Sequence, residues 1–395
     1  MSSEGVICLW QKTIIKREAM IDFGTYEPLG QRLCYRPPVP PFPKLEDVWD
    51  ALRSANQSVE AFDRALEAFP VRNLVGKLFA RLDAVHSSGA EGSTTTFTDL
   101  MEYQTALRRA PDPNDAMQVQ AAAIAFDDLC LNLPDPIAAI RQIHKRLFEH
   151  STDPLRKAQA GQIKNYPNGT MDPEAPSGIF HYCAPASVDE ALREWSALTL
   201  ADDGGPELLR QALSHWMFEH IHPVNDGNGR IGRLLVPLLM RRKGALNNAC
   251  AFFGEAVYRE KDIYVEALKN ARRSGDMTAW CRTFCFLVAQ TACDNLERTR
   301  KLGELYADWR KRARSIRSHS VAHHLLPWIT VTPRFTVKDA LTFAASTGNR
   351  VTFAAMNAAI SRIKDLGIVA LDGAAQSNRL FSAPEVMSLF EVTKI

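Results

Sequence analysis

The sequence predicts a mostly α-helical protein with a small β-hairpin and a C-terminal winged helix-turn-helix. Apolar residues recur at helical spacing along most of the 395-residue chain, and clusters of proline and glycine interrupt that spacing at only a few places. With 46% hydrophobic and 23% charged residues, the composition is that of a globular chain. A chain of this length is expected to form roughly two or three domains.

The bulk composition argues against several classes of protein. A net charge of +2 gives no overall basic field for nucleic acid. The 8 cysteines include no C-x-x-C pair, which argues against a zinc site or disulfide framework and fits a cytoplasmic protein. Lys12, Lys16 and Arg17 interrupt the N-terminus, so we predict no signal peptide. The best apolar run, Leu234–Met240, is too short to span a bilayer.

The N-terminal part contains helices and one polar loop. Residues 35–43, YRPPVPPFP, are extended because each proline restricts the residue before it. We interpret them as a packed lead-in to the first helix, with a partner-recognition motif as the alternative. Small polar residues at 87–98, SSGAEGSTTTFT, indicate a loop with several helix caps. Apolar spacing predicts helices at 45–69, 70–85, 97–109, 113–132 and 134–149.

The middle of the chain returns to helical spacing after one interruption. Residues 161–185 contain several prolines and glycines and end in an apolar piece, so we predict a hairpin-like flap. Residues 310–317, RKRARSIR, are interpreted as a solvated helix end or linker rather than a nucleic-acid contact. Helices are predicted at 187–201, 205–220, 229–243, 260–273 and 275–305.

The C-terminal region has the pattern of a winged helix-turn-helix. Two amphipathic helices and two strand-like segments are predicted at 337–345, 352–366, 368–371 and 379–382. The second helix offers Asn357, Arg362 and Lys364 to a DNA groove, which is a weak footprint. We therefore expect a structural, dimerisation or protein-contact role, with DNA as the less favoured partner.

The most informative stretch is HPVNDGNGRIGR, residues 222–233. A proline stops the preceding helix, and two glycines let the backbone approach a ligand closely. A helix that begins near Gly229 directs its free amide groups and the positive end of its dipole back at this loop, which creates an anion site. Arg230 and Arg233 share one face of that helix, and both can contact phosphate oxygens.

Asp226 and His222 complete the chemistry of this loop. The carboxylate suits Mg²⁺, which binds a few carboxylates together with phosphates. The histidine can take up a proton near neutral pH. A phosphate cradle, a metal-binding carboxylate and a base are what phosphoryl or nucleotidyl transfer requires. These residues leave open which phosphorus is attacked.

This stretch resembles the motif H-P-F-x-[DE]-G-N-G-R-x-x-R of the Fic family. The one departure is Val224, where the family often has Phe. The preceding SHWMFEHIHP also looks like the family's helix, and similarity extends over about residues 30–390. The resemblance implies an N-terminal helical region at 1–110 with an inhibitory helix, a Fic helical-bundle core at 111–318 and the winged helix-turn-helix at 325–395.

The resemblance implies transfer of AMP from ATP to a Ser, Thr or Tyr hydroxyl of a target protein. His222 would deprotonate that hydroxyl, and Asp226 would hold Mg²⁺ on the α- and β-phosphates. The flap resembles the element that pairs with the target segment as a strand.

The nucleotide-binding residues that the resemblance implies are Gly227, Asn228, Gly229, Arg230, Arg233 and Tyr264. The first three would form an anion hole, and the two arginines would hold the β- and γ-phosphates. The tyrosine would join the adenine pocket. Gly229 stands near the place where phosphate-transferring relatives of the Doc type carry Lys, which favours AMP transfer.

Residues 87–92, SSGAEG, match the family's inhibitory motif [ST]-x-x-x-E-[GN]. Ala90 stands where the family commonly has Ile. The resemblance implies that Ser87 and Glu91 are the inhibitory residues. The Glu91 carboxylate would pair with Arg233 and misplace the γ-phosphate of ATP, so that the α-phosphate would not line up for attack.

We therefore predict a cytoplasmic protein adenylyltransferase that uses Mg²⁺ and ATP and is inhibited by Glu91. Its partners would be ATP and an unidentified target protein, without membrane contact, while self-modification and a homodimer stay open. Two alternatives remain: removal of AMP by the same site, and a DNA-binding regulator whose Fic core senses nucleotide. The intact His222 argues against the second, because a sensor has no need of a base.

The other ring side chains near the motif are interpreted as structural. We expect His215 and His220 to pack or to lie at the surface. His181 is expected at a loop position in the flap, with contact to a target as the alternative. The tryptophans at helical positions are predicted to belong to the core: Trp195, Trp216 and Trp280.

Overall fold

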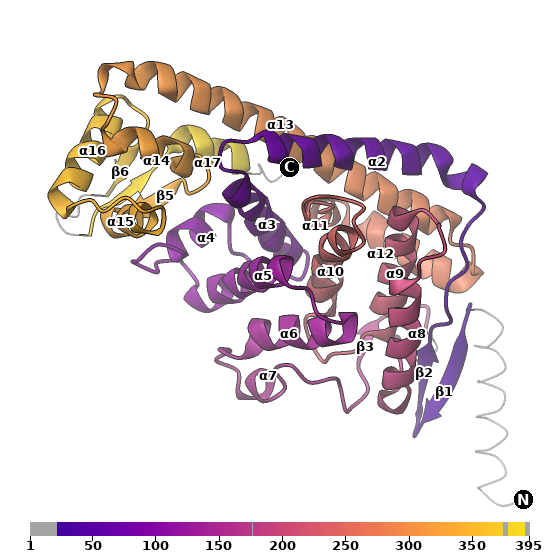
Figure 1. Cartoon of the computed structure of the whole chain (residues 1–395). Helices are drawn as coiled ribbons and strands as arrows, with labels where there is room; N and C mark the ends of the chain where they lie inside the picture. The colour runs from indigo at the N-terminus through magenta and orange to yellow at the C-terminus, as the bar shows by residue number, and fades with distance from the viewer. Residues whose placement is uncertain (1–21, 176, 374–377, 392–395) are drawn as a thin grey trace, which may run out of the picture.

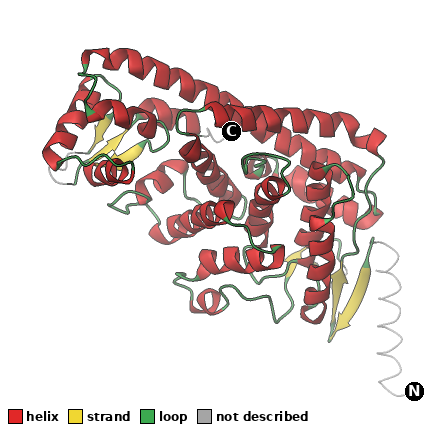
Figure 2. Ribbon diagram, in the orientation of Figure 1, coloured by secondary structure: helices red, strands yellow, loops and turns green. Residues whose placement is uncertain are grey.

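The computed structural model describes residues 22–175, 177–373 and 378–391. The prediction that residues 1–20 do not form a signal peptide concerns residues outside this range. The described part is mostly helical with a few short strands, which confirms the predicted fold class (Figure 2). Among its helices, none combines the length and the apolar character needed to cross a bilayer.

The elements are, in chain order, β1 (Thr25–Leu29), β2 (Arg32–Arg36), α2 (Leu45–Ala68), α3 (Arg72–Gly89), α4 (Phe97–Tyr103), α5 (Pro113–Leu131), α6 (Pro136–Phe148), α7 (Pro154–Ala158), β3 (Gly169–Met171), β4 (Ile179–His181), α8 (Val188–Leu200), α9 (Glu207–Ile221), α10 (Asn228–Arg242), α11 (Gly254–Arg259), α12 (Lys261–Ser274), α13 (Thr278–Arg312), α14 (Val321–Ile329), β5 (Arg334–Thr336), α15 (Val337–Ser346), α16 (Phe353–Asp365), β6 (Ala370–Asp372), β7 (Leu380–Ser382) and α17 (Pro384–Phe390).

Helix α9 lies at the centre of the molecule. It is buried along nearly its whole length, including polar residues such as Arg210, Gln211 and Ser214. The long helices α2 and α13 run side by side along one edge of the molecule (Figure 1). Trp195, Trp216 and Trp280 are each at most 1% exposed, so the prediction that they are core residues is confirmed. Their indole N–H groups all donate to backbone carbonyls, which satisfies them inside the core.

The predicted flap is an antiparallel hairpin of β3 and β4. A second hairpin, β1–β2, extends it into a four-stranded sheet of order β1-β2-β4-β3. β2 joins β4 in parallel through Cys34 and His181. The Pro-rich segment after β2 is a packed lead-in to α2, as predicted, and Phe42 in it lies over the Arg210 guanidinium at 5.3 Å.

The C-terminal region has the predicted helix-turn-helix, α15–α16, followed by two antiparallel strands. A third strand, β5, was not predicted and completes a sheet of order β5-β7-β6. Arg379 donates to the Asn357 side chain at 2.6 Å, so one of the three candidate DNA contacts is already engaged within the domain. Helix α17 packs Phe390 against Phe97 of α4 and Phe79 of α3, with ring centroids 5.0 and 5.8 Å apart.

Three predicted boundaries are wrong. Helix α3 continues through Gly89, because Ser87 and Ser88 are buried and this burial overrides their polar character. Helix α4 ends at Tyr103 instead of 109, and Arg108 beyond it has a positive φ of 49°, which no helix accommodates. Helix α13 runs to Arg312 instead of 305, so the basic segment begins as a helix end.

Candidate active site

The loop between α9 and α10 brings the predicted catalytic residues together. Helix α9 ends at Ile221, and His222 adopts the left-handed conformation with φ 51° and ψ 60°. Gly227, with φ 84°, is the residue before α10. The Asn228 side chain closes the loop, because its Nδ2 donates to the Val224 carbonyl at 2.7 Å and its Oδ1 accepts from the Val224 amide at 3.0 Å.

The first turn of α10 faces this loop with free amide groups. The first backbone bond into the helix runs from the Ile231 amide to the Gly227 carbonyl. No side chain of the described residues caps the helix at Gly227. Because Asn228 uses its side chain within the loop, its contribution to an anion site would be its backbone amide, together with that of Gly229.

His222 is oriented as a proton acceptor. Its Nδ1 lies 3.1 Å from the Glu219 carbonyl, and a carbonyl can only accept, so Nδ1 carries the hydrogen and Nε2 holds the lone pair. The ring stacks on Tyr182 with centroids 3.8 Å apart and planes 5° apart. Burial, together with the nearby Lys164 ammonium, lowers the pKa of His222 to about 3. The imidazole is therefore neutral at pH 7 and able to act as a base.

Arg233 is buried, and Ser87 and Glu91 engage its guanidinium. Its guanidinium is 2.6 Å from the Glu91 carboxylate. It also donates to the Ser87 hydroxyl at 2.8 Å and to the Ser87 carbonyl at 2.9 Å. Burial alone would raise the pKa of Glu91, but the Arg233 guanidinium outweighs it and the pKa is lowered. Glu91 is therefore ionised at neutral pH.

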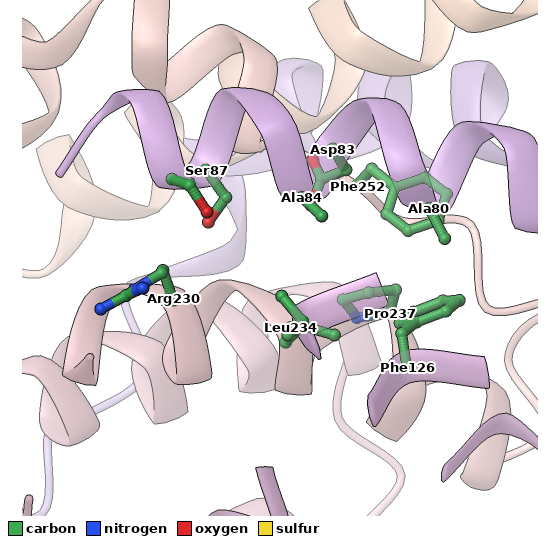
Figure 3. A pocket seen from close by; sticks show the side chains of 11 residues that line it. Ala80, Asp83, Ala84, Ser87, Phe126, Arg230, Leu234, Pro237 and Phe252 are labelled. Atoms are coloured by element: carbon green, nitrogen blue, oxygen red, sulfur yellow. The ribbon is translucent and has the colours of Figure 1, made fainter. Parts of the chain in front are cut away.

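Helix α3 packs closely on α10. Side chains of α3, including Ala84 and Ser87, face Arg230 and Leu234 of α10 across a small cavity (Figure 3). Its volume of about 10 Å³ has room for no more than a single water molecule. Ala90 is 3% exposed, so the smaller residue at this position is still a buried contact.

Asp226 and Arg230 lie on the other side of the loop. The Asp226 carboxylate is 3.1 Å from Arg156 and 3.5 Å from Arg230, and 37% of its side chain is exposed. Within the described residues, no group of three or more His, Cys, Asp or Glu side chains could hold a metal without other ligands. Mg²⁺ binds through one or two carboxylates plus phosphates and water. One accessible carboxylate near the uncapped start of α10 fits that requirement.

Tyr264 lies in the interior. It is 5% exposed, and its hydroxyl is 2.8 Å from Nε2 of His215. Its ring packs against Trp280 with centroids 5.9 Å apart. In this position its printed partners are core side chains, and its role in an adenine pocket stays a prediction. His215 and His220 are both buried, which agrees with the prediction that they pack.

Several residues near the site had not been identified from the sequence. Lys164, Asn168 and Tyr182 surround His222 from the flap side. Glu219 lies three residues before His222, and its Oε1 is buried without a hydrogen-bond partner among the described residues. Lys164, Asn168 and Tyr182 could not be found because residues outside helices show no helical periodicity. Glu219 could not be found because one acidic residue in a helix does not by itself indicate a function.

Glu219 gives a testable pH dependence of stability. Burial raises its pKa from 4.5 to about 8, so the native state keeps a proton that the unfolded state loses between those values. The free energy of unfolding then falls as pH rises through this window. We expect Glu219→Gln to raise it by about 4 kcal/mol at pH 8 and to leave it unchanged at pH 4. Thermal melts at both pH values measure this.

The control for this experiment is Glu190→Gln, which replaces a surface carboxylate whose side chain is 59% exposed. The shift in melting temperature that it causes should be small, and it should be the same at pH 4 and at pH 8. An equal gain at pH 4 and pH 8 for Glu219→Gln would show that the carboxyl does not titrate in this window.

The fold and this loop define a helical protein with an uncapped helix N-terminus beside the histidine of the loop. Residues 133–240 match the family model of the Fic/DOC family. The matched segment includes the loop described above.

Characterised relatives share this similarity over about half of the chain. A protein adenylyltransferase Fic of Nematostella vectensis is 28% identical over 244 residues, which is 56% of this chain and 52% of the relative. One of Aedes aegypti is 26% identical over 210 residues, 51% of this chain and 38% of the relative. A Fic family protein from Desulfovibrio desulfuricans G20 has the same fold, with a TM-score of 0.56 at 13% identity over 87% of this chain and 98% of that chain.

Proposed function

We propose that this protein is a protein adenylyltransferase that transfers AMP from ATP to a hydroxyl side chain of a target protein. The observation that carries the proposal is the neutral His222, held in the same loop as the uncapped start of α10. Arg230 and Arg233 lie on that helix and supply positive charge for phosphates. The names of the relatives support AMP as the transferred group.

The geometry divides the reaction among a few groups. The Nε2 lone pair of His222 accepts the proton of the target hydroxyl, and the freed oxygen bonds to the α-phosphorus. The bond between the α-phosphorus and the bridging oxygen breaks, and pyrophosphate leaves. Backbone amides at the start of α10 stabilise the negative charge that develops on the phosphate. Mg²⁺, held by Asp226 and the phosphates, would neutralise phosphate charge.

The same geometry supports inhibition by Glu91. Its Oε1 lies 2.3 Å from the place that a Cβ on Gly229 would occupy, so the carboxylate sits on the first turn of α10. It occupies the Arg233 guanidinium at 2.6 Å, where the γ-phosphate would bind. A carboxylate and a phosphate cannot share this site, so ATP would bind with its phosphates displaced.

We propose the same three-part division of the chain, at 1–110, 111–318 and 325–395. Helix α13 spans the core and the C-terminal part, and its Trp309 donates to Glu385 of α17 at 2.8 Å. The contacts of Phe390 with α3 and α4 favour a protein-contact role for the winged helix, in which it supports the inhibitory region.

Labelled ATP tests the proposed reaction directly. We expect label at the α-phosphorus to be transferred to protein when Glu91→Gly protein is incubated with Mg²⁺, ATP and a cell lysate. Label at the γ-phosphorus should leave as pyrophosphate. The measurement is gel autoradiography of matched reactions with the two labels. Transfer of the γ-label instead would identify a kinase-type reaction and overturn the proposal.

A further inference from the structure

We propose that Lys164 and Asn168 form a clamp that positions His222 and connects it to the flap. This inference rests on the proposed function, because it assigns both residues to the support of the catalytic base. Neither belongs to the loop 222–233. They lie between α7 and the flap, with Asn168 directly before β3.

The clamp holds four consecutive carbonyls around His222. The Lys164 Nζ donates to the carbonyl of Ile221 at 3.1 Å, and its backbone amide donates to that of Pro223 at 2.9 Å. The Asn168 Nδ2 lies 3.2 Å from the His222 carbonyl and 2.9 Å from that of Val224. Lys164 also donates to the Asn168 Oδ1 at 2.7 Å, so the two side chains brace each other.

This arrangement answers two local requirements of the loop. His222 has a left-handed backbone, which a non-glycine residue keeps only when its surroundings fix it. The last carbonyls of α9 also lack helical partners, and a cation is favourable there. Lys164 is 3% exposed, so its ammonium is committed to these partners rather than to water. Burial lowers its pKa to about 8, which leaves it charged at pH 7.

The clamp also acts on the protonation of the base. After burial, Lys164 is the largest influence that keeps the pKa of His222 low. Glu91 acts in the opposite direction, as does the Glu219 carbonyl. The titratable groups around the ring are Lys164 before the flap, Glu91 after α3, Tyr182 after β4 and His220 on α9. Loss of the Lys164 ammonium should therefore raise the pKa of His222 and loosen the orientation of its ring.

The flap provides the connection to the target. The Asn168 carbonyl accepts from the Tyr182 amide at 3.1 Å, which closes the base of the β3–β4 hairpin. Tyr182 in turn stacks on the His222 ring. A target segment that pairs with the flap would therefore act on the same residues that hold the base, so that docking and proton transfer share one rigid unit.

The test uses nitrogen-15 histidine NMR on the full chain without nucleotide, which reads the His222 tautomer and titration independently of activity. We expect Lys164→Met to raise the midpoint of the His222 titration and to lose the single Nδ1–H tautomer. In the Glu91→Gly background the same change should lower kcat for AMP transfer by about 100-fold, with little change in the KM for ATP. Lys164→Arg, which keeps the positive charge, should partly restore both the His222 tautomer and kcat.

Lys243→Met is the matched control. Lys243 also donates its ammonium to carbonyls at a helix end, those of Leu200 and Ala201 at the C-terminus of α8. Its removal should change neither the His222 signals nor kcat. If Lys164→Met does not fold, Asn168→Leu is a second test of the clamp. It removes the hydrogen bonds to the His222 and Val224 carbonyls and keeps the Lys164 ammonium. A folded Lys164→Met or Asn168→Leu protein with unchanged His222 signals would overturn the clamp, even if AMP transfer itself were never observed.

Discussion

Replacing Glu91 with glycine is expected to raise AMP incorporation by about 5- to 150-fold, the range of a coupling energy of about 1–3 kcal/mol. The substitution removes a carboxylate 2.6 Å from Arg233 and opens the first turn of α10 to phosphate. Glu91 lies in the turn after α3, so glycine there does not interrupt the helix. Intact-mass spectrometry after incubation with ATP and Mg²⁺ counts the AMP groups added to the protein itself.

Two further variants separate charge from structure. Glu91→Gln keeps the size of the side chain and removes the charge, so it should also increase transfer. Glu190→Gly removes a surface carboxylate that pairs with Arg36 at 2.9 Å, and it should leave the rate at the wild-type level. If Glu91→Gly and wild type incorporate AMP equally on both self and lysate proteins, Glu91 is not inhibitory.

Loss of His222 is expected to reduce AMP transfer by about 10²- to 10⁴-fold in the Glu91→Gly background, the usual contribution of a general base. Asparagine is the best replacement, because it tolerates the left-handed backbone that His222 adopts and leaves the loop intact. The measurement is the initial rate of α-label transfer from ATP. ATP binding, followed by thermal shift, should be preserved because the phosphate-binding groups remain.

His150→Asn is the control for that experiment. Its side chain is 75% exposed after α6, so the change should affect neither rate nor stability. An undiminished rate in the His222→Asn protein would show that another group takes the proton, and the proposed mechanism would then be wrong.

The catalytic loop could be predicted from sequence because its signals are local. A proline, two glycines and the start of a helix determine the backbone between His222 and Arg230 within a few residues. The contact between Glu91 and Arg233 joins residues 142 positions apart, and only the resemblance to a family indicated it. The structure adds its geometry, including the way α3 extends to present Ser87 to the same guanidinium.

The supporting residues could not be predicted, because their meaning depends on distant partners. Lys164 is a single lysine in a polar loop, and its partner Ile221 lies 57 positions away. The β1–β2 hairpin has a proline within β1, and its single ladder pair with the flap joins Cys34 to His181, which lies far along the chain. Contacts between residues this far apart in the sequence form only in the folded chain, so local sequence patterns do not predict them.

The order of Glu91 and Arg233 along the chain has a consequence for synthesis on the ribosome. At about 5–20 residues per second, the 142 positions between them correspond to roughly 7–28 s of translation. The segment that occupies Arg233 has therefore already emerged when the catalytic loop is translated. A nascent chain can pair the two as soon as α10 folds, so under the proposed inhibition newly made molecules would have no active interval.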